Sequence, residues 1–86
     1  NETTSKESLL HILELLQAQD VWTLDALHEK LMALVSTLGV KNGLLLYPLR
    51  VALSGKQFTP GGGIELAAVM GKEKTVARVK AALKRL

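Results

Sequence analysis

Apolar residues recur along this chain at the three- and four-residue spacing that places side chains on one face of a helix. The first such stretch predicts a helix from about Ser5 to Ala18, because Thr4 and Glu7 have the spacing of a capping box at a helix start. The side chains expected on its buried face are Leu9, Ile12, Leu13 and Leu16.

A second predicted helix lies between Thr23, a good N-cap, and Gly39, which suits the left-handed conformation just past a helix end. Trp22 and Leu27 flank its start at the spacing of a hydrophobic staple. This helix is the most clearly patterned element of the chain. Its expected buried stripe consists of Leu24, Leu27, Leu31, Leu34, Val35 and Leu38.

The third predicted helix runs from Asn42 to Gly55 and contains Pro48. Because proline lacks an N–H and its ring clashes with the preceding turn, we expect either a kink or a break after which Pro48 begins a new helix. Either geometry would set the direction of the segment that carries Arg50.

Two further helices complete the pattern. Thr59 and Pro60 have the order of an N-cap followed by the first helical residue, which predicts a short helix ending at Gly71. A final helix starts at Lys72 and is basic on much of its surface. The chain is therefore predicted to be all-α, a compact bundle of about five short helices, with residues 1–86 forming a single domain. The apolar side chains expected on one side of the last helix are Val76, Val79, Leu83 and Leu86.

Composition supports this fold class. The chain is 48% hydrophobic but only 3% aromatic, so its core must consist of Leu, Val, Ile and Ala, which favours close-packed helices. Without cysteine it has neither a disulfide framework nor a thiolate metal site. No apolar run approaches the roughly 20 residues that span a bilayer, and nothing resembles a secretory signal. We therefore expect a soluble, cytoplasmic protein that does not enter a membrane.

Charge is divided unevenly along the chain. Residues 1–40 contain two basic and six acidic residues, a net charge of −4, whereas residues 41–86 contain nine basic and two acidic residues, a net charge of +7. A strongly basic half attracts polyanions from a distance, as a nucleic-acid partner requires. The alternative is an ordinary solvated helix surface.

The sequence offers little for catalysis. His11 and His28 lie in different predicted helices without ligand spacing. Asp25 and Glu29 share a helix face but are explained by solvation and by the preference of anions for a helix start. We find no phosphate-binding Gly-x-x-x-x-Gly-Lys loop. No catalytic or metal-binding residue is therefore expected in this chain.

One spaced series of motifs is more specific. It consists of Pro-Leu-Arg-Val-Ala-Leu-Ser-Gly at residues 48–55, Thr-Pro-Gly at 59–61 and Gly-Lys-Glu at 71–73. In this order and separation, the series resembles the end of bacterial-type glutamyl-tRNA synthetases, a family of class I aminoacyl-tRNA synthetases. The resemblance is strongest over about residues 47–73.

The resemblance implies that the chain is the C-terminal part of an all-helical anticodon-binding region in a larger enzyme. That enzyme would ligate glutamate to its tRNA with ATP and magnesium in a catalytic domain absent from this chain. The implied partners are the anticodon loop of glutamate-specific tRNA and the rest of the synthetase. No cofactor is expected in this domain, and we expect a monomer.

The resemblance also assigns tRNA contacts. Arg50 corresponds to an arginine that contacts an anticodon base, a role for which a guanidinium is suited because it can pair with a base edge or stack on a base. Without the resemblance, Arg50 is better explained as a capping or salt-bridge residue. Thr59 corresponds to a hydroxyl partner for a base and Pro60 to an apolar surface; an N-cap role for Thr59 is compatible with both.

The Thr-Pro-Gly motif ends at Gly61, and two further glycines, Gly62 and Gly63, follow it. Free N–H groups at a helix start can receive a phosphate, although a flexible connector is the alternative. The family usually has apolar residues after Pro-Gly, so here only backbone contact is expected at Gly62. The residues expected to contact phosphates, or else to be simply solvated, are Lys72, Lys74 and Arg78.

Two other functional classes stay open. A small helical protein-interaction module would dock a partner on its Leu-rich faces, and its binding would tolerate salt, whereas tRNA binding would weaken steeply with ionic strength. Binding of the basic last helix to an anionic membrane is less attractive, because that helix lacks Trp and Phe.

Overall fold

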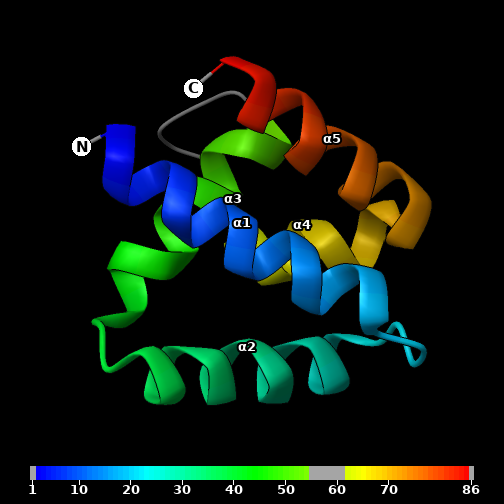
Figure 1. The fold of residues 1–86 in the computed structure, drawn as a ribbon. Coiled ribbons are helices and arrows are strands. Elements are labelled where there is room, and N and C mark those ends of the chain that lie inside the picture. Colours follow the sequence, from blue (N-terminus) through cyan, green and yellow to red (C-terminus); the bar gives the residue numbers. More distant parts are fainter. Residues whose placement is uncertain (1, 55–61, 86) are drawn as a thin grey trace.

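The computed structural model describes residues 2–54 and 62–85. Within these residues the chain folds into five helices and no strand, which confirms the all-α prediction (Figure 1). The helices are α1 (Glu2–Ala18), α2 (Leu24–Leu38), α3 (Asn42–Ser54), α4 (Gly63–Met70) and α5 (Lys72–Arg85).

α1 is longer than predicted. It begins at Glu2, so Thr4 lies inside the helix, and the prediction of a start near Ser5 was wrong. Neither glycine nor proline precedes Ser5, so nothing in the sequence stops the helix from extending toward the N-terminus. The end at Ala18 agrees with the prediction. Leu9, Ile12 and Leu16 are buried as expected.

α2 has the caps that its sequence predicts. The Thr23 hydroxyl oxygen accepts the N–H of Ala26 at 3.2 Å. Gly39 has a φ of 66°, its N–H donates to the Ser36 carbonyl at 3.2 Å, and the next N–H, of Val40, donates to the carbonyl of Val35 at 3.3 Å. These two bonds form a Schellman motif. The buried face is narrower than expected, because Leu24, the first residue of the helix, is 45% exposed.

α3 is the central element of the bundle, since it contacts each of the other four helices. It is one continuous helix from Asn42 to Ser54, so of the two alternatives at Pro48 the break is excluded and the kink stays a prediction. Pro48 cannot donate to the carbonyl of Leu44, four residues earlier. The hydroxyl of Ser8 in α1 donates to that carbonyl instead, at 3.4 Å, and this bond supports the continuous helix.

α4 starts later than predicted. Its N-cap is Gly62, so the prediction that Thr59 caps this helix and that Pro60 begins it was wrong; both residues lie outside the described part of the chain. The Glu65 carboxylate accepts the N–H of Gly62, and this bond favours a start at that position. The end at Gly71, with a φ of 88°, agrees with the prediction.

α5 begins at Lys72 as predicted and packs against α1, α3 and α4. Val79 is buried, and Val76 and Leu83 are partly buried against the core, whereas Leu86 lies outside the described residues. Thr75, which the pattern did not single out, is also fully buried. Its hydroxyl donates to the Ala67 carbonyl of α4 at 3.3 Å.

The connection between α1 and α2 is also fixed to the core. Trp22 donates its indole N–H to the carbonyl of Ala67 at 2.8 Å and packs against the buried cluster. No helix within residues 2–54 and 62–85 is both long enough and apolar enough to cross a membrane.

Candidate nucleic-acid interface

The start of α4 lies directly against α3 at Arg50. Gly63 is buried, and a Cβ atom placed on it would lie 3.1 Å from the backbone nitrogen of Arg50 and 3.1 Å from Cγ of Leu49. A larger residue would therefore require the α3 backbone at Arg50 and the Leu49 side chain to move by a few tenths of an ångström. The last glycine of the run is therefore needed for the close packing of α4 on α3, a requirement that the sequence alone did not reveal.

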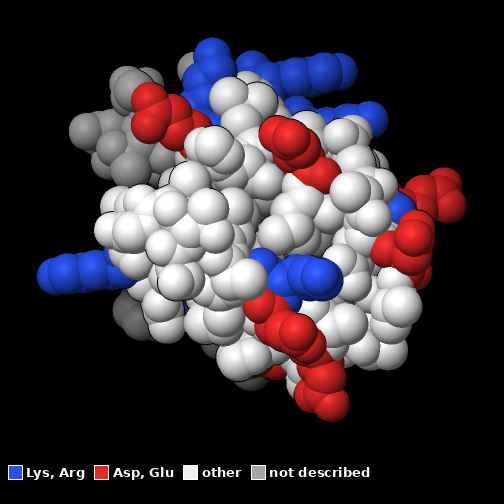
Figure 2. All heavy atoms as spheres, turned by 60° about the horizontal axis from the view of Figure 1, so that its bottom comes forward, with Lys and Arg blue, Asp and Glu red and all other residues white. Residues whose placement is uncertain are grey.

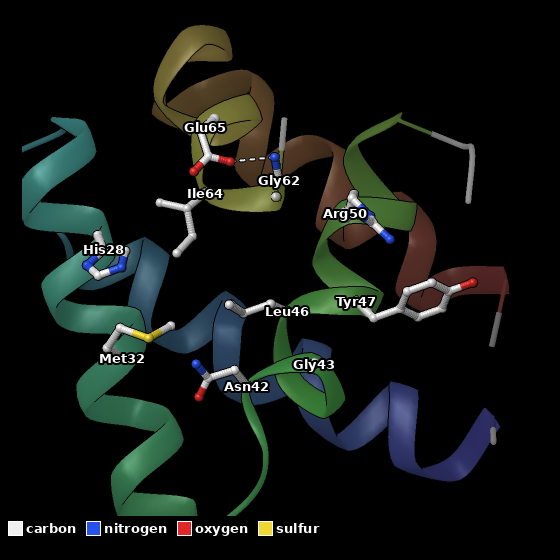
Figure 3. A pocket seen from close by; sticks show the side chains of 11 residues that line it. His28, Met32, Asn42, Gly43, Leu46, Tyr47, Arg50, Gly62, Ile64 and Glu65 are labelled. Atoms are coloured by element: carbon white, nitrogen blue, oxygen red, sulfur yellow. Dashed lines mark hydrogen bonds between the residues drawn. The ribbon is translucent and has the colours of Figure 1, made fainter. Parts of the chain in front are cut away.

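A groove of about 390 Å³ opens beside this contact (Figure 3). One wall consists of His28 and Met32 from α2. The opposite wall comes from α3, and the start of α4 closes one end with Gly62, Gly63, Ile64 and Glu65. The residues that α3 contributes are Asn42, Gly43, Leu46, Tyr47 and Arg50.

Arg50 is partly buried at the edge of this groove. Its guanidinium carbon lies 5.7 Å from the ring centroid of Tyr47, a cation–π distance, and Figure 3 shows the side chain turned toward that ring. Its Nε atom is buried and has no hydrogen-bond partner within the described part of the chain. The tyrosine ring, rather than a helix cap, is the partner described for this guanidinium.

The N–H of Gly62 is not free, contrary to expectation. It donates to the Glu65 carboxylate, so a phosphate at this helix start would have to displace a negative charge. Since glycine has no side chain, only this half of a capping box is formed at Gly62. The three residues before it, Thr59, Pro60 and Gly61, lie outside the described residues.

The three predicted phosphate contacts differ from one another, and none lines the groove beside Arg50. Lys72 donates to the carbonyls of Gln17 at 3.1 Å and Gln19 at 2.8 Å, at the end of α1. Arg78 donates through Nη1 to the Leu53 carbonyl in the last turn of α3 at 3.2 Å. Lys74 is exposed. Lys72 and Arg78 thus supply positive charge at the ends of helices that have no basic residue in their own last turns.

Most lining residues of the groove were not predicted as contacts, among them His28, Asn42 and Tyr47. His28 and Asn42 belong to no motif, so nothing in the sequence alone marks them. Tyr47 lies three residues before Arg50, and residues three apart are neighbours on a helix surface. That spacing could have identified the pair.

Charged side chains are distributed unevenly over the surface. On the face seen in Figure 2, lysine and arginine side chains gather mainly at the upper edge, while acidic side chains are scattered over the rest of that face. Within the described residues, no group of three or more His, Asp or Glu side chains is placed to hold a metal ion.

Comparison with known proteins identifies the family. A family model described as an anticodon binding domain matches residues 1–83. The glutamate–tRNA ligase of Clostridium tetani (strain Massachusetts / E88) is 45% identical over 86 residues, which are 100% of this chain and 18% of that protein. That of Clostridium botulinum (strain Loch Maree / Type A3) is 48% identical over 82 residues, 95% of this chain and 17% of that protein.

The chain spans less than a fifth of the length of these relatives, of which it covers 18% and 17%. The family model accounts for residues 1–83 of 86, so an anticodon binding domain makes up nearly all of this chain. The chain belongs to the anticodon binding domain family and is homologous to part of the glutamate–tRNA ligases.

Proposed function

We propose that this chain is the C-terminal anticodon-binding domain of a cytoplasmic, monomeric glutamate–tRNA ligase, and that it holds the anticodon loop of glutamate tRNA in the groove beside Arg50. The observation that carries the proposal is the 45% identity over the whole chain to a glutamate–tRNA ligase. Ligation of glutamate, with ATP and magnesium, belongs to a catalytic part of the enzyme outside this chain.

The groove has the chemistry that an unstacked nucleotide requires. Sequence-specific RNA recognition commonly uses splayed bases that stack on aromatic or guanidinium planes and form hydrogen bonds through their edges. Arg50 and Tyr47 provide such planes, and the Asn42 amide lies on the same wall with donors and an acceptor. Arg50 therefore contacts a base, and Asn42 is available for a second edge.

Backbone phosphates are contacted by exposed basic residues. Lys74 remains a candidate for this role, because it is exposed. Lys72 and Arg78 contribute mainly by holding α1 and α3 in place, since each already donates to carbonyl oxygens there. Thr59, Pro60 and Gly61 remain candidates for base contact by position in the motif.

The test is a titration of the isotope-labelled chain with a glutamate-tRNA anticodon stem-loop and with the same stem-loop carrying an altered anticodon, at two salt concentrations. Arg50→Ala should weaken binding of the cognate loop by about 1–3 kcal/mol and reduce discrimination between the two loops. Lys30→Ala, which removes the same charge from an exposed site on α2, is the control and should leave discrimination unchanged.

Two outcomes would contradict the proposal. If Arg50→Ala lost the same affinity for both stem-loops, Arg50 would be a phosphate contact that does not read the base. Absence of stem-loop binding, together with salt-tolerant capture of a protein partner, would favour the protein-interaction module instead.

A further inference from the structure

A second groove lies on the other side of Tyr47, where α3, the C-terminal half of α5 and the start of α1 meet (Figure 1). Its volume of about 400 Å³ falls within the roughly 300–1,000 Å³ of small-ligand sites. Val51 and Ala52 of α3 and Ala81 and Ala82 of α5 make much of its lining apolar. Because these side chains are short, they leave the groove open between the two helices.

The charge of this groove has one sign. Arg78 and Arg85 line it, and the described lining residues include no acidic side chain. Arg78 is anchored at the groove by its bond to the Leu53 carbonyl, and Arg85 is exposed in the last turn of α5. An apolar floor between two guanidinium groups suits a ligand with a flat apolar part and an anionic part, as in a nucleotide.

Tyr47 connects this groove to the one beside Arg50, because it lines both. The ring is 43% exposed, and the Arg50 guanidinium occupies one side of it. Figure 3 shows the ring pointing away from His28 and Met32 on the far wall of the first groove. A strand leaving the Arg50 groove would therefore pass the ring and enter the second groove.

We propose that the groove between α3 and α5 is a subsite for the nucleotide that flanks the anticodon, with its base against Tyr47 and Val51 and its phosphate at Arg85. This inference rests on the proposed function, because the occupant belongs to the same single-stranded loop. Two arginines without an acidic neighbour in the groove attract an anion and disfavour a purely apolar protein segment.

Two alanines of α5 provide a matched test. Ala81 lines the groove and Ala77, one turn earlier, does not, while both are exposed. Ala81→Glu and Ala77→Glu change the net charge equally, so a larger loss of binding in Ala81→Glu cannot come from net charge. Ala77 lies beside Lys72 and Lys74, so any effect of Ala77→Glu on a phosphate contact there would reduce this difference rather than create it. We expect Ala81→Glu to weaken binding of the anticodon stem-loop at least about fivefold more than Ala77→Glu, the loss of one stacked base and its phosphate contact.

A second pair of variants tests whether the positive charge of Arg85 binds the phosphate. Arg85→Ala and Lys84→Ala each remove one positive charge from the end of α5, but only Arg85 lines the groove. Arg85→Ala should weaken binding more than Lys84→Ala does.

Tyr47→Leu should weaken binding about fivefold or more, whereas Tyr47→Phe, which keeps the ring, should bind nearly as well as the unsubstituted chain.

Abasic stem-loops locate the nucleotide. Each lacks the base on one side of the anticodon. With the stem-loop that lacks the base bound in the second groove, the penalty of Tyr47→Leu should become smaller, while the penalty of Arg50→Ala should persist. Equal binding by Ala81→Glu and Ala77→Glu would overturn the subsite but leave anticodon recognition intact if Arg50→Ala still reduces discrimination. Failure of the unsubstituted chain to bind any stem-loop would overturn both proposals.

Discussion

Ser8 of α1 donates its hydroxyl to the carbonyl of Leu44, the group that Pro48 leaves without its normal helical donor. The bond joins residues 36 positions apart in the sequence. It connects the first helix to the turn just before Arg50, so the geometry of the candidate site depends in part on a residue far from every motif.

Ser8→Ala should lower the free energy of unfolding by about 0.5–1 kcal/mol, because the partly buried Leu44 carbonyl loses its donor. The measurement is urea unfolding followed by circular dichroism. In a Pro48→Ala background the same substitution should have a smaller effect, since residue 48 would then donate to Leu44. Equal effects of Ser8→Ala in both backgrounds would show that the serine does not substitute for the missing donor.

Gly63→Ala should destabilise the fold by about 1–3 kcal/mol, because its methyl group would meet the backbone of Arg50 at 3.1 Å. Gly43→Ala is the matched control. It lies in α3 with nothing within 4 Å of an added Cβ, and it should stabilise the chain by about 0.4–1 kcal/mol. Thermal unfolding of the two variants compares their stabilities directly. If Gly63→Ala left the stability unchanged, α4 would be able to move away from α3 without a loss of stability.

Lys72→Met should lower the free energy of unfolding by about 1 kcal/mol, since its ammonium group holds the carbonyls at the end of α1. Lys74→Met removes the same charge from an exposed position and should change stability by less than about 0.5 kcal/mol. Under conditions in which both variants are fully folded, Lys74→Met should lose more RNA affinity than Lys72→Met. If Lys72→Met lost more RNA affinity than Lys74→Met, Lys72 would be a direct contact to the RNA.

Ala67 has a carbonyl that accepts three donors, from Trp22 at 2.8 Å, Gly71 at 3.1 Å and Thr75 at 3.3 Å. Trp22→Phe should destabilise the chain by about 1 kcal/mol through loss of the shortest of these bonds. Thr75→Val should be nearly neutral, because an isosteric apolar side chain leaves no unpaired donor and Ala67 keeps two partners. Chemical unfolding of both variants tests whether Trp22→Phe lowers stability more than Thr75→Val does.

Local chemistry made much of the fold predictable. Thr23 and Gly39 act within their own turns, so the bounds of α2 could be derived from sequence. The start of α4 could not, because Thr59-Pro60 and Gly62 with Glu65 are both acceptable helix starts and local pattern does not decide between them. The donor that replaces the missing N–H of Pro48 in α3 is Ser8, which only the tertiary arrangement brings to Leu44.

The candidate site was predictable in one part only. Motif spacing marked Arg50, but the wall formed by His28 and Asn42 arises from packing and has no sequence signature. The spacing of basic residues in α5 likewise could not show that Lys72 would meet a carbonyl 53 residues away. Surface lysines are indistinguishable in sequence until the fold places acceptors near some of them.

The contact of α3 with every other helix has a consequence for the thermodynamics of binding. The backbone that carries Arg50 cannot shift without disturbing four interfaces, so little backbone freedom remains to be lost when a nucleotide arrives. Association then has a smaller entropic penalty than it would with a recognition residue on a loop, and adaptation to different bases is limited to side-chain rotation. In the proposed function, Arg50 would therefore discriminate between bases by fit, because the surrounding helices would not rearrange around a wrong base.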